Sequence, residues 1–411
     1  MPKPLRILHT SDWHLGRTLC GRRRGAEFDG FLDWLTDTIE EEQIDVLLVA
    51  GDVFDGLNPS PAAQELYYRF LSRLAAGSAC VQVVIIAGNH DSPALLSAPA
   101  EILKALDIHV VGRLPADVRD EVISLKDKDG RTRLIVAAVP YPRDRDLRES
   151  LAGENPAEKE RKLVEAICAH YREAGQAARE MLLALNEPVP VVGMGHLFAA
   201  GGQVVEGDGV RNLYVGSLGR VPAEAFPAVF NYLALGHLHQ GQLVGGDPAR
   251  RYSGSPLAHS FAEAGRDKSV VLVEFFPNKI EVKTIGVPVF QRLERLEGDW
   301  PAIEKGLNAL AAEQAEAWLE IEYTGQTVMG GLKEKVAEAV GQAPLEVLRL
   351  KNGSVKNFSL AADGRVENLD ELDENEVFRR CLEAQEVPEE QRFDLWAAYG
   401  EILAALREED S

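Results

Sequence analysis

Aspartate, asparagine and histidine side chains follow five short apolar segments of the sequence, in most cases directly after a glycine. The five motifs are Asp12-x-His14, Gly51-Asp52, Gly88-Asn89-His90-Asp91, Gly195-His196 and Gly236-His237-Leu238-His239. Mixed oxygen and imidazole ligands suit Mn²⁺, Fe²⁺ or Zn²⁺, whereas Ca²⁺ or Mg²⁺ alone would favour oxygen ligands only. One carboxylate that bridges two such cations holds them ~3.5–4 Å apart, a spacing that clamps a phosphate group and activates water. The motifs therefore predict a binuclear centre for phosphoester hydrolysis with these candidate ligands: Asp12, His14, Asp52, Asn89, His196, His237 and His239.

Taken one at a time, the motifs differ in how strongly they indicate a metal site. An aspartate after glycine, as at Asp52, is typical of a turn or a helix cap, and a lone histidine such as His196 is more often structural. The motif at 88–91 indicates more, because three polar groups directly after a buried run would be costly without a purpose. His237 and His239 are alternate residues, which point the same way on an extended chain. The coincidence of all five motifs favours the metal centre.

The elements that must position these motifs are five β-strands. Apolar runs predict strands over 5–8, 46–50, 81–87, 189–194 and 232–235, and helical spacing predicts helices over 27–42, 61–76 and 158–185. Further strands are predicted over 122–125, 134–139, 270–275 and 280–285, enough for a second sheet. Because strands of one sheet end along a common edge, we expect the five motifs to converge on one cleft of an α/β domain, residues 1–286.

The remainder of the chain predicts a smaller α/β domain and a helical tail. Residues 287–352 contain strand patterns at 318–323 and 345–350 and helix patterns at 299–313 and 332–340, the first opening with Asp299 as a cap. Residues 353–411 begin with an acidic connector and continue as two amphipathic helices. The apolar stripes of these helices include Phe378, Trp396 and Tyr399. Such stripes pack on their own domain or dock on a partner, and the residues leave both open.

Composition places the chain among intracellular globular proteins. No apolar run reaches the ~18 residues of a membrane span, so no membrane partner is expected. The four cysteines contain no CxxC pair, which fits a reducing cytoplasm. The net charge of −21 argues against a surface-wide platform for nucleic acid. One basic cluster beside the first motif is either a solvated loop or a phosphate contact: Arg17, Arg22, Arg23 and Arg24.

The motif set, in this order, resembles the calcineurin-like metallophosphoesterase superfamily. More narrowly, the chain resembles the SbcD family of bacterial nuclease subunits over nearly its whole length. The segments that carry this resemblance are 10–16, 49–55, 87–92, 235–239, 252–256 and the tail segment 369–378. The resemblance implies a two-sheet αββα sandwich, followed by a small α/β capping domain and C-terminal helices.

The resemblance also implies a role for each site residue. One Mn²⁺ would be bound by Asp12, His14, Asp52 and His239, and the other by Asp52, Asn89, His196 and His237. His90 would contact the scissile phosphate, with Asp91 orienting it. Asp55 stands where archaeal relatives carry a histidine that contacts the phosphate, and it is therefore a further candidate beside the substrate.

The function implied by the resemblance is that of a DNA nuclease. SbcD proteins are Mn²⁺-dependent 3′–5′ exonucleases on double strands and endonucleases on single strands and hairpins, gated by ATP through the SbcC ATPase. They act in DNA repair, recombination and replication. The capping domain would position DNA, the tail would bind SbcC, and the chain would form a homodimer within a heterotetramer in the cytoplasm, at the nucleoid. Two alternatives stay open from the residues alone: a phosphodiesterase or phosphatase for small substrates, and a non-catalytic subunit bridging DNA and an ATPase.

Overall fold

The computed structural model describes residues 3–77, 81–147, 155–185, 187–200, 220–325 and 329–353. The chain divides into two compact units, the first ending at Glu294 and the second beginning at Arg295. Among the described residues, no helix is long and apolar enough to cross a membrane. Phe378, Trp396 and Tyr399 of the predicted tail helices lie outside the described residues.

Two six-stranded sheets form the first unit. The first sheet has the order β14 (Lys279–Val287), β13 (Lys268–Phe276), β1 (Leu5–Thr10), β4 (Val46–Ala50), β5 (Gln82–Ile86) and β6 (Ile108–Val111). The second has the order β11 (Gln242–Val244), β12 (Asp247–Tyr252), β10 (Tyr232–Gly236), β9 (Val191–His196), β8 (Thr132–Ala138) and β7 (Val122–Lys126). In each sheet, parallel strands occupy the centre.

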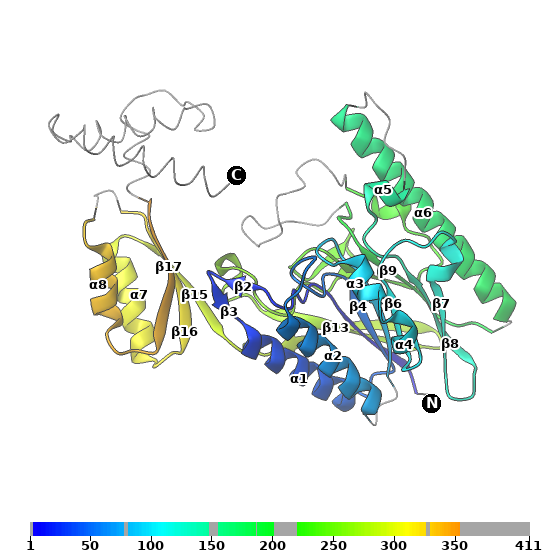
Figure 1. The fold of residues 1–411 in the computed structure, drawn as a ribbon, viewed down its shortest axis with the longest axis horizontal. Helices are drawn as coiled ribbons and strands as arrows, with labels where there is room; N and C mark the ends of the chain where they lie inside the picture. The colour runs from blue at the N-terminus through cyan, green and yellow to red at the C-terminus, as the bar shows by residue number, and fades with distance from the viewer. Residues whose placement is uncertain are drawn as a thin grey trace. The chain divides into compact units, whose positions relative to one another are not determined.

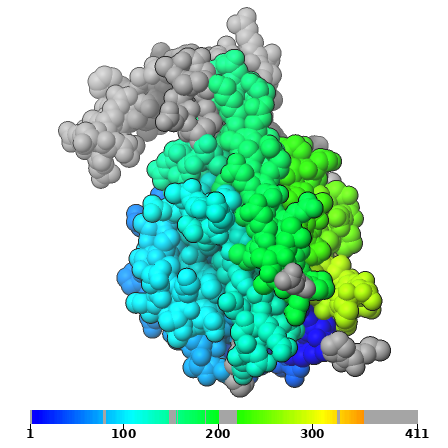
Figure 2. Space-filling model, turned by 90° about the vertical axis from the view of Figure 1, so that its right-hand side faces the viewer, coloured from blue at the N-terminus to red at the C-terminus, as the bar shows by residue number. Residues whose placement is uncertain are grey.

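Helices cover the outer faces of both sheets and complete an αββα sandwich (Figure 1). Helices α1 (Gly25–Glu41) and α2 (Pro61–Ala76) pack on the first sheet, and α6 (Pro156–Leu185) packs on the second. Helix α6 also stands out from the face of this unit in the space-filling view (Figure 2). The sandwich predicted from the sequence is therefore confirmed.

The faces between the two sheets form a third apolar layer. Ile7, Leu48 and Val84 of the first sheet belong to the same buried cluster as Val136 and Val192 of the second. Central strands that are buried on both faces need continuous apolar sequence, which is why their runs stand out in the chain.

The sheet assignment of the five motif-bearing strands corrects the sequence interpretation. Strands β1, β4 and β5 lie in the first sheet, whereas β9 and β10 lie in the second. The two sheets pack face to face, so two separate edges meet instead of one. An apolar run shows that a strand is buried but not which sheet it joins.

Short elements fill the connections of the first unit. They are β2 (Thr18–Leu19), β3 (Arg22–Arg23), α3 (Pro93–Ser97), α4 (Ala100–Lys104) and α5 (Asp144–Leu147). Strands β2 and β3 form a small antiparallel hairpin, which places the predicted arginine cluster directly after the first motif.

The described part of the second unit is a three-stranded sheet with two helices. The sheet has the order β15 (Arg292–Gly298), β16 (Ala317–Tyr323) and β17 (Leu345–Asn352), and α7 (Trp300–Ala312) and α8 (Leu332–Val340) pack against it. The carboxylate of Asp299 accepts a hydrogen bond from the Ala302 amide, so the predicted cap of α7 is confirmed.

Candidate metal centre

The seven predicted ligands lie together where β1, β4, β5, β9 and β10 end, in the first unit. Side-chain contacts connect them in two groups. In one group, Nε2 of His14 lies 3.2 Å from Nε2 of His239. In the other, Oδ1 of Asn89 lies 3.0 Å from Nε2 of His196 and 3.1 Å from Nδ1 of His237.

Asp52 lies between the two groups. Its Oδ2 atom is 3.6 Å from Nε2 of His14 and 3.4 Å from Nε2 of His196. Its other oxygen accepts a hydrogen bond of 2.8 Å from the amide of His90. The same carboxylate oxygen therefore faces one imidazole of each group, as a bridging ligand must.

Asp12 is oriented by its own set of hydrogen bonds. Its carboxylate accepts from the amide of His237, at 3.0 Å, and from the hydroxyl of Ser11, which also contacts Ser253. Ligand oxygens and nitrogens of Asp12, Asp52 and His196 lie within 4.8 Å of one another. Asp12 is therefore held beside the same centre, with its carboxylate fully buried.

The backbone at these motifs is strained in a way that only the structure reveals. Asp12, His14, Asp52 and His237 all have positive φ, between 48° and 107°. Such conformations cost roughly 1–3 kcal/mol each for a residue other than glycine and cluster at functional sites. Glycine is needed beside them, because a Cβ at Gly88 would overlap the Asp52 carboxylate.

The arrangement fits divalent cations. Two ligand atoms bound to one cation at about 2.1 Å lie about 3–3.5 Å apart, which matches the contacts around His14, His239 and Asn89. The centre also buries two carboxylates, Asp12 and Asp52, among histidines. A cation would offset the cost of burying these charges.

The pKa values in the metal-free protein follow from burial and from Asp52. Burial alone would raise the pKa of Asp52, but the neighbouring imidazoles of His196 and His14 hold it well below its ordinary value. Burial would lower the pKa of His196, but the Asp52 carboxylate outweighs it and raises that pKa to about 9. Burial and the charge of His196 lower the pKa of His237 to about 3, so His237 is neutral and ready to coordinate.

Metal binding is therefore expected to release protons. At pH 7, His196 is below its pKa of about 9 and carries a proton that a cation must displace. We expect about one proton released from this site and an affinity that rises about tenfold per pH unit up to pH 9. Calorimetric titration with Mn²⁺ in buffers of different protonation enthalpy measures the proton count. An affinity independent of pH between 7 and about 9 would contradict the expectation, and His196→Asn is the control that removes the titrating group.

His90 lies beside the centre but is tied down by a different group than predicted. Its Nδ1 atom is 3.0 Å from the carbonyl oxygen of Asp55. The carboxylate of Asp91 instead accepts hydrogen bonds from the amides of Gly88, Val53 and Phe54 at 2.8–3.1 Å. The prediction that Asp91 orients His90 is thus corrected: this buried carboxylate finds three backbone donors and holds the loops of the second and third motifs together.

The candidate substrate-binding residues separate into buried and exposed groups. Asp55 lies 3.3 Å from Nδ1 of His14 and 3.0 Å from the guanidinium of Arg17. Arg22 and Arg23 are exposed on the hairpin. Arg24 is buried and bound through two nitrogens to Glu27, which corrects its assignment as a phosphate contact.

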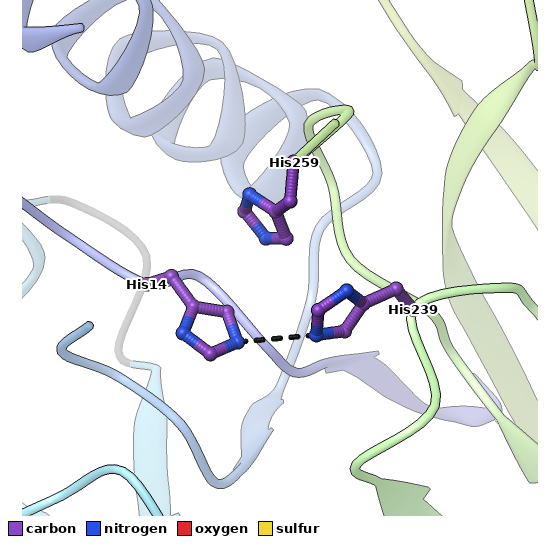
Figure 3. A group of neighbouring side chains, drawn as sticks. All are labelled: His14, His239 and His259. Carbon is purple, nitrogen blue, oxygen red and sulfur yellow. Dashed lines mark hydrogen bonds between the residues drawn. The ribbon is translucent and has the colours of Figure 1, made fainter. Parts of the chain in front are cut away.

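Sequence reasoning missed His259, which lies against His14 and His239 (Figure 3). It also missed Tyr141, whose ring meets that of His196, and Arg143, which donates to the carbonyl of Asp91. His259 comes seven residues after strand β12 ends, away from any glycine–histidine pair, so the spacing of the motifs gave no signal for it.

Two family models match separate parts of the chain. The model described as calcineurin-like phosphoesterase matches residues 5–196, which contain four of the five metal motifs. The model described as type 5 capsule protein repressor C-terminal domain matches residues 289–386.

Relatives with similarity along the chain are all named as the SbcD subunit of the nuclease SbcCD. The protein of Escherichia coli strain K12 is 36% identical over 405 residues, which cover 98% of each chain. That of Rhodobacter capsulatus is 39% identical over 276 residues, or 66% of each chain. That of Bacillus subtilis is 39% identical over 279 residues, or 67% of each chain.

Proposed function

Because the chain belongs to the SbcD family of nuclease subunits, we propose that it is a manganese-dependent DNA nuclease that binds two cations around Asp52. Family membership confirms the resemblance predicted from the sequence and makes the chain a metal-dependent hydrolase of the nuclease class. The observation that carries the two-cation proposal is the single carboxylate oxygen of Asp52 that faces both His14 and His196.

In this proposal, the ligands divide between the cations as their contacts do. Asp12, His14 and His239 complete one site with Asp52, and Asn89, His196 and His237 complete the other. Two bound cations would lower the pKa of an attacking water and stabilise the charge that develops on the phosphate. Asp55, whose carboxylate is 3.3 Å from Nδ1 of His14, would orient that ligand, a common partnership in metal sites.

His90 is the proposed residue for the leaving oxygen. Its Nδ1 atom donates to the carbonyl of Asp55, so Nε2 is the nitrogen left for a phosphate oxygen. A protonated Nε2 would stabilise the transition state and deliver a proton to the departing sugar oxygen. Asp91 would support this step indirectly, by fixing the loop from Gly88 that carries His90.

The proposed substrate is DNA, cut as a 3′–5′ exonuclease on double strands and as an endonuclease on single strands and hairpins. The E. coli relative, which aligns over 98% of the chain, is named as a subunit of the SbcCD nuclease. We therefore assign the DNA-positioning role to residues 287–352 and binding of the SbcC ATPase, with ATP gating, to residues 353–411. The assembly would be a homodimer within a heterotetramer, located in the cytoplasm at the nucleoid.

A cleavage assay with the full chain and SbcC tests this function. We expect hairpin-ended and linear duplex DNA to be cut with Mn²⁺, more slowly with Mg²⁺, and not at all after chelation, because the centre has no substitute for the cations. Intact DNA in the Mn²⁺-loaded complex would contradict the proposal. Faster turnover of cyclic nucleotides than of DNA would instead favour a small-substrate phosphodiesterase.

A further inference from the structure

Three imidazole rings converge in one buried place: His14, His239 and His259 (Figure 3). The ring centroids are 4.8 Å apart for His14 and His259, 4.9 Å for His239 and His259, and 5.1 Å for His14 and His239. The His259 ring meets the other two edge to face, at 82° and 75°. His259 is 2% exposed, so its contacts are all made inside the protein.

The polar contact of the His259 ring is with the backbone of the first motif. Its Nε2 atom lies 3.0 Å from the carbonyl oxygen of Asp12. A carbonyl only accepts, so Nε2 carries the proton and donates it to this bond. Asp12 has a φ of 54°, and His14 has a φ of 48°. The bond is therefore made to a backbone segment that needs outside support to keep its conformation.

The backbone of His259 is fixed by a buried ion pair that also reaches His239. The amide of His259 donates to Glu263, at 3.1 Å, and Glu263 pairs with Lys268. The ammonium of Lys268 also donates to the carbonyl of His239, at 3.2 Å, and to the hydroxyl of Ser255, at 2.9 Å. One polar network thus connects His259 to the backbone of His239.

We propose that His259 is a positioning residue for one of the two cations, a role that rests on the metal centre proposed above. It holds the strained Asp12–His14 segment through the Asp12 carbonyl and fixes the ring planes of His14 and His239. Asp12, His14 and His239 belong to the same proposed site, whereas the other site is formed by Asn89, His196 and His237. Loss of His259 should therefore weaken one cation and spare the other.

Two substitutions of similar polarity separate the hydrogen bond from mere filling of space. The amide nitrogen of His259→Gln reaches the position of Nε2 and can donate to Asp12. That of His259→Asn reaches only the position of Nδ1, where it cannot. His109→Asn, on β6 in the first sheet, is the matched control.

The readout is Mn²⁺ binding to the metal-free full chain, followed by electron paramagnetic resonance of free Mn²⁺. We expect two sites in the wild type, and in His259→Asn one site weakened by about 10–100-fold with the other within about threefold. His259→Gln should regain most of the loss, and His109→Asn should bind like the wild type. Thermal unfolding of the metal-free variants checks that each is folded.

The outcomes separate this inference from the proposed centre. A wild type that binds fewer than two cations would overturn the centre and the inference together. Two wild-type sites that stay unchanged in His259→Asn would overturn the inference alone. If His259→Gln were as weak as His259→Asn and also changed the visible absorption of bound Co²⁺, His259 would be a ligand itself, which would overturn the positioning role.

Discussion

Replacing Asp52 with asparagine is expected to lower the rate of DNA cleavage by about 10³-fold or more. The Oδ2 atom of Asp52 faces both His14 and His196, so this residue is the proposed ligand of both cations. Asparagine keeps the size of the side chain and a carbonyl oxygen that can accept from the His90 amide. It removes the negative charge that offsets two cations in a buried site. The loss should therefore appear in metal binding as well as in the rate.

The measurement pairs cleavage of linear duplex DNA with the number of Mn²⁺ ions bound per chain. We expect Asp52→Asn to bind fewer cations than the wild type and to stay inactive when Mn²⁺ is raised. Asp129→Asn is the matched control, because Asp129 is exposed in the turn between β7 and β8. An Asp52→Asn chain with two bound cations and a wild-type rate would contradict the bridging role.

Elements with a strong apolar period could be predicted closely from the sequence. The strand predicted over 46–50 and the helix predicted over 61–76 coincide with β4 and α2. β4 is buried at every residue, so its whole length had to be apolar. In α2, Ser60 caps the first turn and Pro61 begins the helix, which fixed its start.

Elements without such a period were missed. Strand β15 has the sequence RLERLEG, and its two leucines are three residues apart, which is not the alternation of a half-buried strand. It is an edge strand that pairs with β16 on one side, so its polar side chains stay compatible with the sheet. The hairpin of β2 and β3 is likewise too short to carry a pattern.

The site shows a similar division between side-chain identity and backbone geometry. The predicted ligands were found because each is a polar residue placed directly after an apolar strand. The roles of Asp91 and His259 depend on which carbonyls and amides come near them, and these belong to residues distant in sequence. Spacing cannot report such contacts. Burial of Arg24 against Glu27 is a further case, since a basic run in sequence does not show which of its members faces solvent.

Replacing His90 with asparagine is expected to lower the cleavage rate by about 10²–10⁴-fold while both cations stay bound. The Nδ1 atom of His90 donates to the carbonyl of Asp55, and the asparagine amide can take over this bond. What asparagine lacks is a group at the position of Nε2, the nitrogen proposed to contact the leaving oxygen. Because His90 is not a proposed ligand, Mn²⁺ affinity should change by no more than about threefold, far less than for a residue that supports a ligand.

The comparison of His90→Asn with His90→Gln and His90→Ala tests the step at Nε2. Glutamine places an amide donor near that position and should recover part of the rate, since a donor without a transferable proton still stabilises charge on the phosphate. Alanine also removes the ring that packs 4.8 Å from the ring of His14, so a further loss in His90→Ala would measure that packing. Equal Mn²⁺ binding in all three variants is needed for this interpretation. A wild-type rate in His90→Asn would mean that no proton or hydrogen bond from Nε2 takes part in the reaction.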